Sequence, residues 1–147
     1  MPVTVRLLDS AELDTILPLV QQLNPKLDEP TIRARLDEMR STNYRCIGAF
    51  AGDDSDKKLV GICGVWTGTK LWCGKFIEAD NVVVDSNHRS LGIGEKMMAF
   101  LHELGKQEGC DLAVLDTYVT YARAQKFYFG LGHDIRGFHF VREFERR

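Results

Sequence analysis

The chain has 147 residues, of which 44% are hydrophobic and 27% are charged, and its formal net charge is −2. This length suits one domain with a substantial core, and the composition excludes a disordered or collagen-like chain. The balanced charge gives no general attraction to nucleic acid or to an anionic membrane, and no apolar stretch is long enough to span a bilayer. Because the N-terminal residues also lack the apolar run of a signal peptide, a cytoplasmic location is expected.

The first half of the chain predicts a strand, two helices and a hairpin. Residues 3–8 are rich in β-branched side chains, and Ser10 offers an N-cap for a helix with apolar residues at helical spacing. The Asn24-Pro25 pair ends this helix, and a second short helix is expected after Pro30. Residues 44–51 and 59–66 alternate on either side of a polar turn, which is typical of an antiparallel hairpin.

The second half predicts strands that alternate with helices. Residues 71–85 end in an apolar run typical of a strand covered on both faces. An amphipathic helix then begins near Gly92 and ends at Gly109, and 112–115 form a buried strand. A last helix stops near Gly132 and leads into an alternating end strand, 138–144. The order predicts a single α/β domain over residues 1–147 with a mixed sheet.

The cysteines and histidines do not predict a metal or thiol site. The four cysteines form no Cys-x-x-Cys pair and the four histidines show no metal-ligand spacing, so free thiols and no metal are expected. Cys46, Cys63 and Cys73 lie in predicted strands, which disfavours a Cys/His nucleophilic enzyme. Cys110 and Asp111 are interpreted as structural residues.

A glycine-containing loop between the strand ending at Val84 and the next helix is the main candidate for a binding site. A loop that leads into a helix N-terminus exposes backbone N–H groups, and the helix dipole adds about half a positive charge there. Gly92 and Gly94 let the backbone approach phosphate oxygens closely, and Arg89 can add a charge-assisted hydrogen bond. The loop therefore suits a pyrophosphate, although Gly-x-Gly alone is also typical of a tight strand-to-helix turn.

Two other phosphate-binding motifs do not fit this loop. A Walker A loop needs Lys and Ser or Thr after its last glycine, whereas Glu95-Lys96 follows Gly94 here. A dinucleotide fingerprint needs three spaced glycines near the start of a βαβ unit, and this loop follows an antiparallel hairpin past the middle of the chain.

The loop resembles the Gln/Arg-x-x-Gly-x-Gly/Ala signature of the GNAT superfamily of acyl-CoA N-acyltransferases. The matching residues are Arg89-Ser90-Leu91-Gly92-Ile93-Gly94. A second family element, Asn-x-x-Ala-x-x-Phe/Leu-Tyr-x-x-x-Gly, is similar to the segment from Tyr121 to Gly132. Tyr121 departs from the family pattern, because many members carry an asparagine there that helps to hold the pantetheine arm; a tyrosine hydroxyl can replace that contact.

The resemblance implies a fold and a set of coenzyme-binding residues. The expected fold is one N-acetyltransferase domain with a mixed, mostly antiparallel sheet, splayed central strands that admit the acyl-CoA, and helices on both faces. Acetyl-CoA is the implied co-substrate, and no metal is required. The residues implied to bind it are the loop Arg89, Ser90, Leu91, Gly92, Ile93 and Gly94, the backbone of Val82, Val83 and Val84, and Tyr121.

Three side chains are candidates for proton transfer. An amine with a pKa of about 10.4 is almost fully protonated at pH 7, so a proton acceptor is useful. Glu78 and Asp80 alternate along a predicted strand, which places both carboxylates on one face. Members of the family carry a catalytic base at one or the other of these positions. Glu78 is preferred here, with Asp80 or a water as alternatives. Both carboxylates are also typical of solvated strand residues without a catalytic role. The resemblance places the hydroxyl of Tyr128 near the coenzyme sulfur, as a general acid.

The predicted function is transfer of an acetyl group from acetyl-CoA directly to a primary amine of a small molecule or a protein. The alternative is a noncatalytic acyl-CoA-binding regulatory module, against which Tyr128 argues. The net charge disfavours an RNA acceptor. Acceptor-binding residues are expected in the first two helices, the 67–75 connection and the final strand, and the acceptor's identity and a homodimeric assembly are both left open.

Overall fold

The computed structural model describes residues 1–146, which fall into two compact units, one over residues 1–115 and one from residue 116 onward. The first unit contains β1 (Val3–Leu7), η1 (Ser10–Ile16), α1 (Leu17–Leu23), α2 (Glu29–Arg40), β2 (Arg45–Ala51), β3 (Lys58–Lys70), β4 (Gly74–Val84), η2 (Ser86–His88), α3 (Ile93–Gln107) and β5 (Leu112–Leu115). The second unit contains α4 (Ala122–Gly130). Within residues 1–146, no helix combines the length and the apolar character that crossing a membrane requires. One domain over residues 1–147 stays a prediction.

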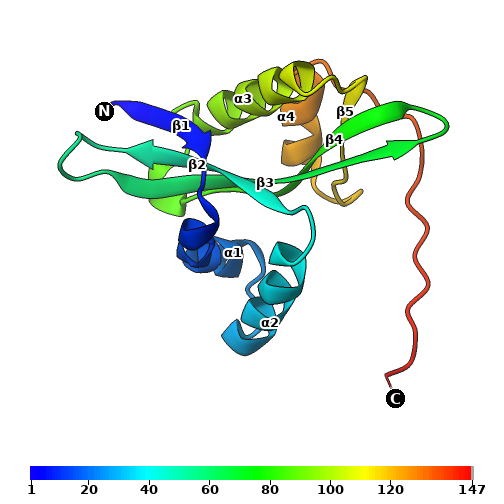
Figure 1. Cartoon of the computed structure of the whole chain (residues 1–147), viewed down its shortest axis with the longest axis horizontal. Helices are drawn as coiled ribbons and strands as arrows, with labels where there is room; N and C mark the ends of the chain where they lie inside the picture. Colours follow the sequence, from blue (N-terminus) through cyan, green and yellow to red (C-terminus); the bar gives the residue numbers. More distant parts are fainter. Residues whose placement is uncertain (147) are drawn as a thin grey trace. The chain divides into compact units, whose positions relative to one another are not determined.

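The first unit is built on a single five-stranded sheet with the strand order β1-β2-β3-β4-β5. The first three pairings are antiparallel, and β4 pairs with β5 in parallel. Helices α1 and α2 lie on one face of this sheet and α3 lies on the other (Figure 1). The predicted mixed, mostly antiparallel sheet with helices on both faces is therefore confirmed.

The first helical segment begins one residue earlier than the sequence predicted. Asp9, and not Ser10, is the N-cap of η1, and the backbone N–H of Asp9 donates to the Glu12 carboxylate at 2.8 Å. Arg6 holds the same carboxylate through two hydrogen bonds of 2.7 and 2.8 Å. The Arg6–Glu12 pair therefore determines where the segment begins. The sequence prediction considered only the N-cap residue and did not include this pair.

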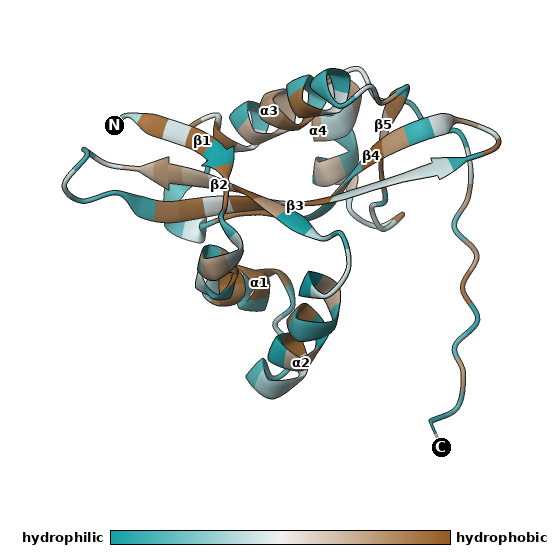
Figure 2. Cartoon of the chain, viewed as in Figure 1, coloured by the Kyte–Doolittle hydropathy of each residue, from teal (hydrophilic) through white to brown (hydrophobic). Residues whose placement is uncertain are grey.

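The hydrophobic core occupies both faces of the sheet, and apolar residues cover the strands and the helix surfaces that pack on them (Figure 2). On the α3 face, Met97 and Leu101 are fully buried. Glycine allows this helix to come close, because a Cβ at Gly105 would lie 2.7 Å from Cγ2 of Ile77. On the other face, residues of η1, α1 and α2 pack against Tyr44 and neighbouring strand residues in one buried cluster.

A β-bulge interrupts the pairing between β3 and β4. Asp80 pairs with Gly64 and Val83 pairs with Ile62, so β4 advances three residues while β3 advances two. Asn81, at the extra residue, has a positive φ of 52°. Because opposed residues share a face, Asp80 and Val83 lie on the same face although they are three residues apart.

The pairing between β4 and β5 ends just before this bulge, and the splaying of the central strands that the family resemblance implied stays a prediction. Strands β4 and β5 pair in register only from Phe76↔Leu112 to Ala79↔Leu115. In the first unit, the last residues of β4 therefore pair with β3 on one side and with no strand on the other. The backbone of Val82, Val83 and Val84 lies along this unpaired edge.

The predicted end strand at 138–144 is wrong as a strand of this structure. The part of the chain after α4 that the structure describes contains no strand, and Phe138, Phe140 and Phe144 are exposed. The alternation of apolar and polar residues at 138–144 indicates only that one face of the segment is apolar. A strand also needs a neighbouring strand for its backbone hydrogen bonds, and the alternation does not show whether one is present.

The close packing opposite the bulge can be tested at Gly64. A Cβ at this position would lie 2.6 Å from the backbone oxygen of Asp80 and 2.7 Å from the Tyr44 hydroxyl. Because a backbone atom and a buried ring must both move, we expect Gly64→Ala to lower the free energy of unfolding by about 1–3 kcal/mol. Chemical denaturation measures this, with Gly130→Ala as the control, because beyond its chain neighbours and the backbone of its own helix no described atom lies within 4 Å of a Cβ there. Equal stability of Gly64→Ala and the parent would contradict the described packing.

Candidate functional site

The loop that follows β4 begins with a turn fixed to its surroundings by Asp85. The Asp85 carboxylate contacts Nδ1 of His88 at 3.0 Å and accepts hydrogen bonds from Nε2 of Gln22 at 3.3 Å and from the backbone N–H of Asn87 at 3.4 Å. Burial acts to raise the pKa of Asp85, but the hydrogen bonds from His88, Asn87 and Gln22 outweigh it, so the pKa is lowered. Since the Asp85 N–H also donates to the carbonyl of Val60 at 2.8 Å, the turn is tied to both β3 and α1.

The next residues form the predicted glycine loop, in which two residues with left-handed backbone conformation are separated by one residue. Ser90 has a φ of 68° and Gly92 has a φ of 71°. Gly92 is the N-cap of α3 and provides no side-chain cap. The first hydrogen bond of the helix runs from the N–H of Lys96 to the carbonyl of Gly92. The earlier amides of α3 consequently have no partner within the helix.

Arg89 and Gly92 complete the features that a pyrophosphate needs. Arg89 is exposed and forms no hydrogen bond or ion pair with any described residue, so its guanidinium is available to an anion. A Cβ at Gly92 would lie 3.3 Å from Oε2 of Glu95, and the positive φ disfavours any other residue. The loop therefore fits a pyrophosphate group by its backbone conformation, its unpaired amides and its free cation.

The two candidate carboxylates lie on one face of the sheet, as the alternation predicted. Glu78 pairs across the strands with Trp66, and Asp80 pairs with Gly64. Trp66 packs against the buried cluster of η1, α1 and α2, so both carboxylates are on the face that these helices cover. Nε1 of Trp66 donates to the Asp80 carboxylate at 2.9 Å and orients it.

Sequence reasoning missed Trp66 and Tyr44 as residues of this region. The Tyr44 ring packs on Trp66 with centroids 5.1 Å apart, and the side chain is 5% exposed. Its hydroxyl has no hydrogen bond of good geometry within residues 1–146, although the Cys46 thiol is near. Burial raises the pKa of Tyr44, and the nearby Cys46 and Asp80 add to this effect. Only the strand register brings these residues together, and the sequence does not specify that register.

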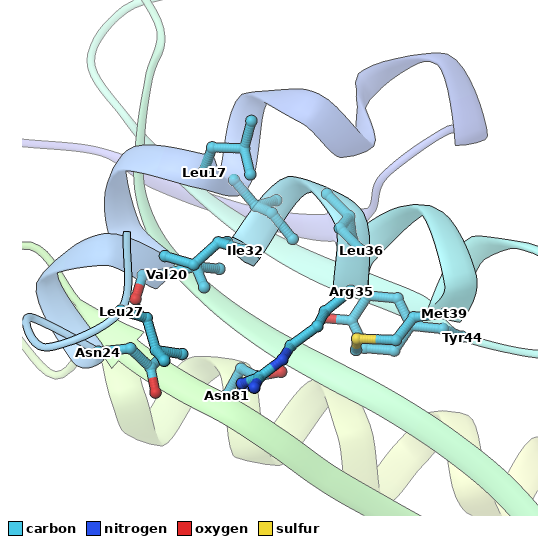
Figure 3. A pocket seen from close by; sticks show the side chains of 11 residues that line it. Leu17, Val20, Asn24, Leu27, Ile32, Arg35, Leu36, Met39, Tyr44 and Asn81 are labelled. Carbon is cyan, nitrogen blue, oxygen red and sulfur yellow. Dashed lines mark hydrogen bonds between the residues drawn. The ribbon is translucent and has the colours of Figure 1, made fainter. Parts of the chain in front are cut away.

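A pocket of about 130 Å³ opens beside the bulge, between α1, α2 and β4 (Figure 3). Its walls are mainly apolar side chains from η1, α1, α2 and the short connection between the two helices. Its polar lining residues are Asn24, Arg35, Tyr44 and Asn81. The sequence predicted that the first two helices would contribute to an acceptor site, and the structure places a pocket there that also includes the bulge residue.

The remaining candidates, Tyr121 and Tyr128, belong to the second unit. Tyr121 is the N-cap residue of α4, and its ring lies 5.2 Å from that of Tyr118. The Tyr128 ring lies 6.0 Å from the ring of His133, whose backbone N–H donates to the Tyr128 carbonyl at 3.1 Å. The roles of both tyrosines at the coenzyme stay predictions.

The cysteines are free thiols, and the two most buried ones are poor nucleophiles. Cys46 and Cys63 lie in the core, where burial raises the pKa of Cys46 to about 12 and also raises that of Cys63. A thiolate is therefore strongly disfavoured at both positions near neutral pH.

Comparison with known proteins supports the fold assignment. The family model described as acetyltransferase (GNAT) family matches residues 13–132. Glucosamine 6-phosphate N-acetyltransferase 1 of Oryza sativa subsp. japonica is 28% identical over 117 residues, which cover 76% of this chain and 71% of that protein.

Two solved structures share the fold. Glucosamine-6-phosphate N-acetyltransferase from Arabidopsis thaliana has a TM-score of 0.72 at 23% identity, with 99% of this chain and 100% of that chain covered. AAC(6')-Iy, in complex with the bisubstrate analog CoA-S-monomethyl-acetylneamine, has a TM-score of 0.81 at 19% identity, with 97% and 99% covered. Because the family model spans most of the sequence, this chain belongs to the acetyltransferase (GNAT) family.

Proposed function

We propose that this chain is an N-acetyltransferase that transfers an acetyl group from acetyl-CoA directly to a primary amine of a small molecule or a protein. The glycine loop carries the proposal, because its two left-handed residues lead into a helix N-terminus that has no side-chain cap. Acetyl-CoA, when bound, supplies an activated thioester. A cytoplasmic location stays a prediction.

The proposed coenzyme site combines the loop with the free edge of β4. The amides near Gly92 and Gly94 and the guanidinium of Arg89 hold the pyrophosphate, with Ser90, Leu91 and Ile93 completing the loop. The backbone of Val82–Val84 pairs with the extended pantetheine arm, in the way that an added strand binds a sheet edge. The end of the pairing between β4 and β5 supports this placement, and Tyr121 is proposed as a further contact to the arm.

The proposed proton acceptor is a carboxylate on the face of β4 that α1 and α2 cover. Glu78 is preferred by the family resemblance, while Asp80 has a defined donor in Trp66 and precedes the pocket residue Asn81. Either carboxylate, or a water that it orients, takes a proton from the amine as the nitrogen attacks. Tyr128 is proposed to donate a proton to the departing sulfur, which completes the proton balance of the transfer.

The first prediction concerns the loop. Gly94→Glu adds a negative charge to the first turn of α3, and we expect it to weaken CoA binding by at least about tenfold through repulsion of the pyrophosphate. Isothermal titration calorimetry with CoA measures the effect. Ala99→Glu is the control, because it adds the same charge at an exposed position of the same helix. A folded Gly94→Glu variant with parental affinity would refute the assignment of the loop.

The second prediction separates the two carboxylates. Glu78→Gln and Asp80→Asn are compared in a pH profile of kcat/KM, and the variant that lacks the base should lose about 10²-fold or more, mainly at lower pH. CoA affinity should stay the same in both, since neither side chain belongs to the loop. Two profiles identical to that of the parent would assign the proton to water alone.

The third prediction tests Tyr128 and separates an enzyme from a coenzyme-sensing module. The proton is needed only as the sulfur leaves, so Tyr128→Phe should lower kcat by about 10²- to 10⁴-fold with little change in acetyl-CoA affinity. Tyr118→Phe, at an exposed tyrosine of the same unit, serves as the control. Full activity of Tyr128→Phe contradicts the proposed role. Tight CoA binding without turnover of any amine, in the parent as well, favours the regulatory module.

A further inference from the structure

We infer that the pocket between α1, α2 and the β4 bulge binds the acceptor, and that this acceptor is a primary amine with one compact apolar group and a carboxylate, as in an apolar α-amino acid. The inference rests on the proposed function and adds the chemical class of the acceptor. It names Arg35 as the residue that binds the carboxylate.

The location of the pocket suits an acceptor. Asn81 lines it and directly follows Asp80, so the pocket opens at the strand segment that carries the candidate bases. The register places Glu78 and Asp80 on the pocket's side of the sheet. A Cβ at Gly64 would lie 2.7 Å from the Tyr44 hydroxyl and 2.6 Å from the Asp80 backbone oxygen. The pocket residue Tyr44 therefore lies beside the bulge.

The walls of the pocket favour an apolar group and disfavour a polyhydroxylated ring. Leu17, Val20, Ile32 and Leu36 are among the apolar side chains that line it. Each hydroxyl moved there without a hydrogen bond would cost about 1–3 kcal/mol. A volume of about 130 Å³ is close to that of an apolar cavity that accepts one benzene molecule, roughly 150 Å³, so a single compact apolar group fits.

The charge of the pocket favours an anionic group on the same molecule. Arg35 is the one charged side chain among the residues that line the pocket, and it has no hydrogen bond or ion pair with any described residue. Figure 3 shows its side chain extending from α2 toward the side of the pocket on which Asn81 lies. A guanidinium binds a carboxylate through two parallel hydrogen bonds, which would hold the amine in one orientation.

One hydrogen-bonding group remains available beside this cation. The Asn81 side chain forms no hydrogen bond with any described residue, and it lines the pocket. Its amide can donate to the carboxylate of a bound acceptor or accept from the amine. The pocket thus combines apolar walls, one cation and one unused amide.

The experiment compares L-leucine with L-leucinamide, which differ only in the carboxylate. Release of free CoA gives kcat/KM for both amines with the parent, Arg35→Gln and Arg33→Gln; Arg33 lies on α2 outside the pocket and pairs with Glu29. Because the two amines differ in basicity, the quantity compared is the leucine-to-leucinamide ratio in each variant. We expect Arg35→Gln to lower this ratio by at least about tenfold, mostly through KM for leucine, and Arg33→Gln to leave it unchanged.

Two further arms separate the failure of this inference from failure of the proposed function. Calorimetric titration of L-leucine into the CoA-bound protein tests the pocket without turnover, and Arg35→Gln should abolish measurable binding. Glucosamine 6-phosphate tests an anionic acceptor with a polyhydroxylated body.

If amines are acetylated but the leucine-to-leucinamide ratio is insensitive to Arg35, or if glucosamine 6-phosphate exceeds leucine in kcat/KM, the acceptor class is wrong and the proposed function stands. If leucine binds through Arg35 but no amine is acetylated, the pocket is right and the proposed function fails.

Discussion

The extra residue in β4 determines which face each of the last residues of this strand presents to the helices. A regular strand alternates its side chains, so Asp80 and Val83 would point to opposite faces; with Asn81 inserted they share one. The strand before the bulge pairs with β5, and the strand after it does not. The same irregularity thus lies next to the unpaired edge of β4, places Val83 on the face of Asp80, and supplies Asn81 to the wall of the pocket.

Glycine and aromatic residues make this irregularity possible at low cost. Gly64 leaves room for the Tyr44 ring opposite the bulge, and Trp66 fixes the Asp80 carboxylate with its indole N–H. Both rings are held by the buried cluster under α1 and α2. A site built on strands and supported by buried rings is more rigid than a site on loops, which suits a reaction that depends on the position of a proton acceptor.

Periodicity and turn residues predicted most elements of the fold, since amphipathic stripes and proline or glycine boundaries report local geometry. The loop at Gly92 could be predicted because its backbone conformation depends on residues that are adjacent in the sequence. The bulge, the roles of Trp66 and Tyr44, and the Arg35 pocket were not predicted, because they depend on register between strands far apart in sequence. For the same reason the alternation at Phe138–Phe144 predicted a strand but gave no information about a partner for it, in this chain or in a second copy.

Because of the bulge, β4 could lose one residue at this position without a change in its pairing with β3. Asp80↔Gly64 and Val83↔Ile62 flank it, and a regular ladder would need only one residue opposite Cys63, where β4 has two, Asn81 and Val82. Removing Asn81 would therefore leave the pairing on both sides unchanged, whereas a deletion elsewhere in the strand would shift its side chains to the wrong face. The pairing on either side does not require the additional residue; its consequences lie in the shared face of Asp80 and Val83 and in the amide that Asn81 adds to the wall of the pocket.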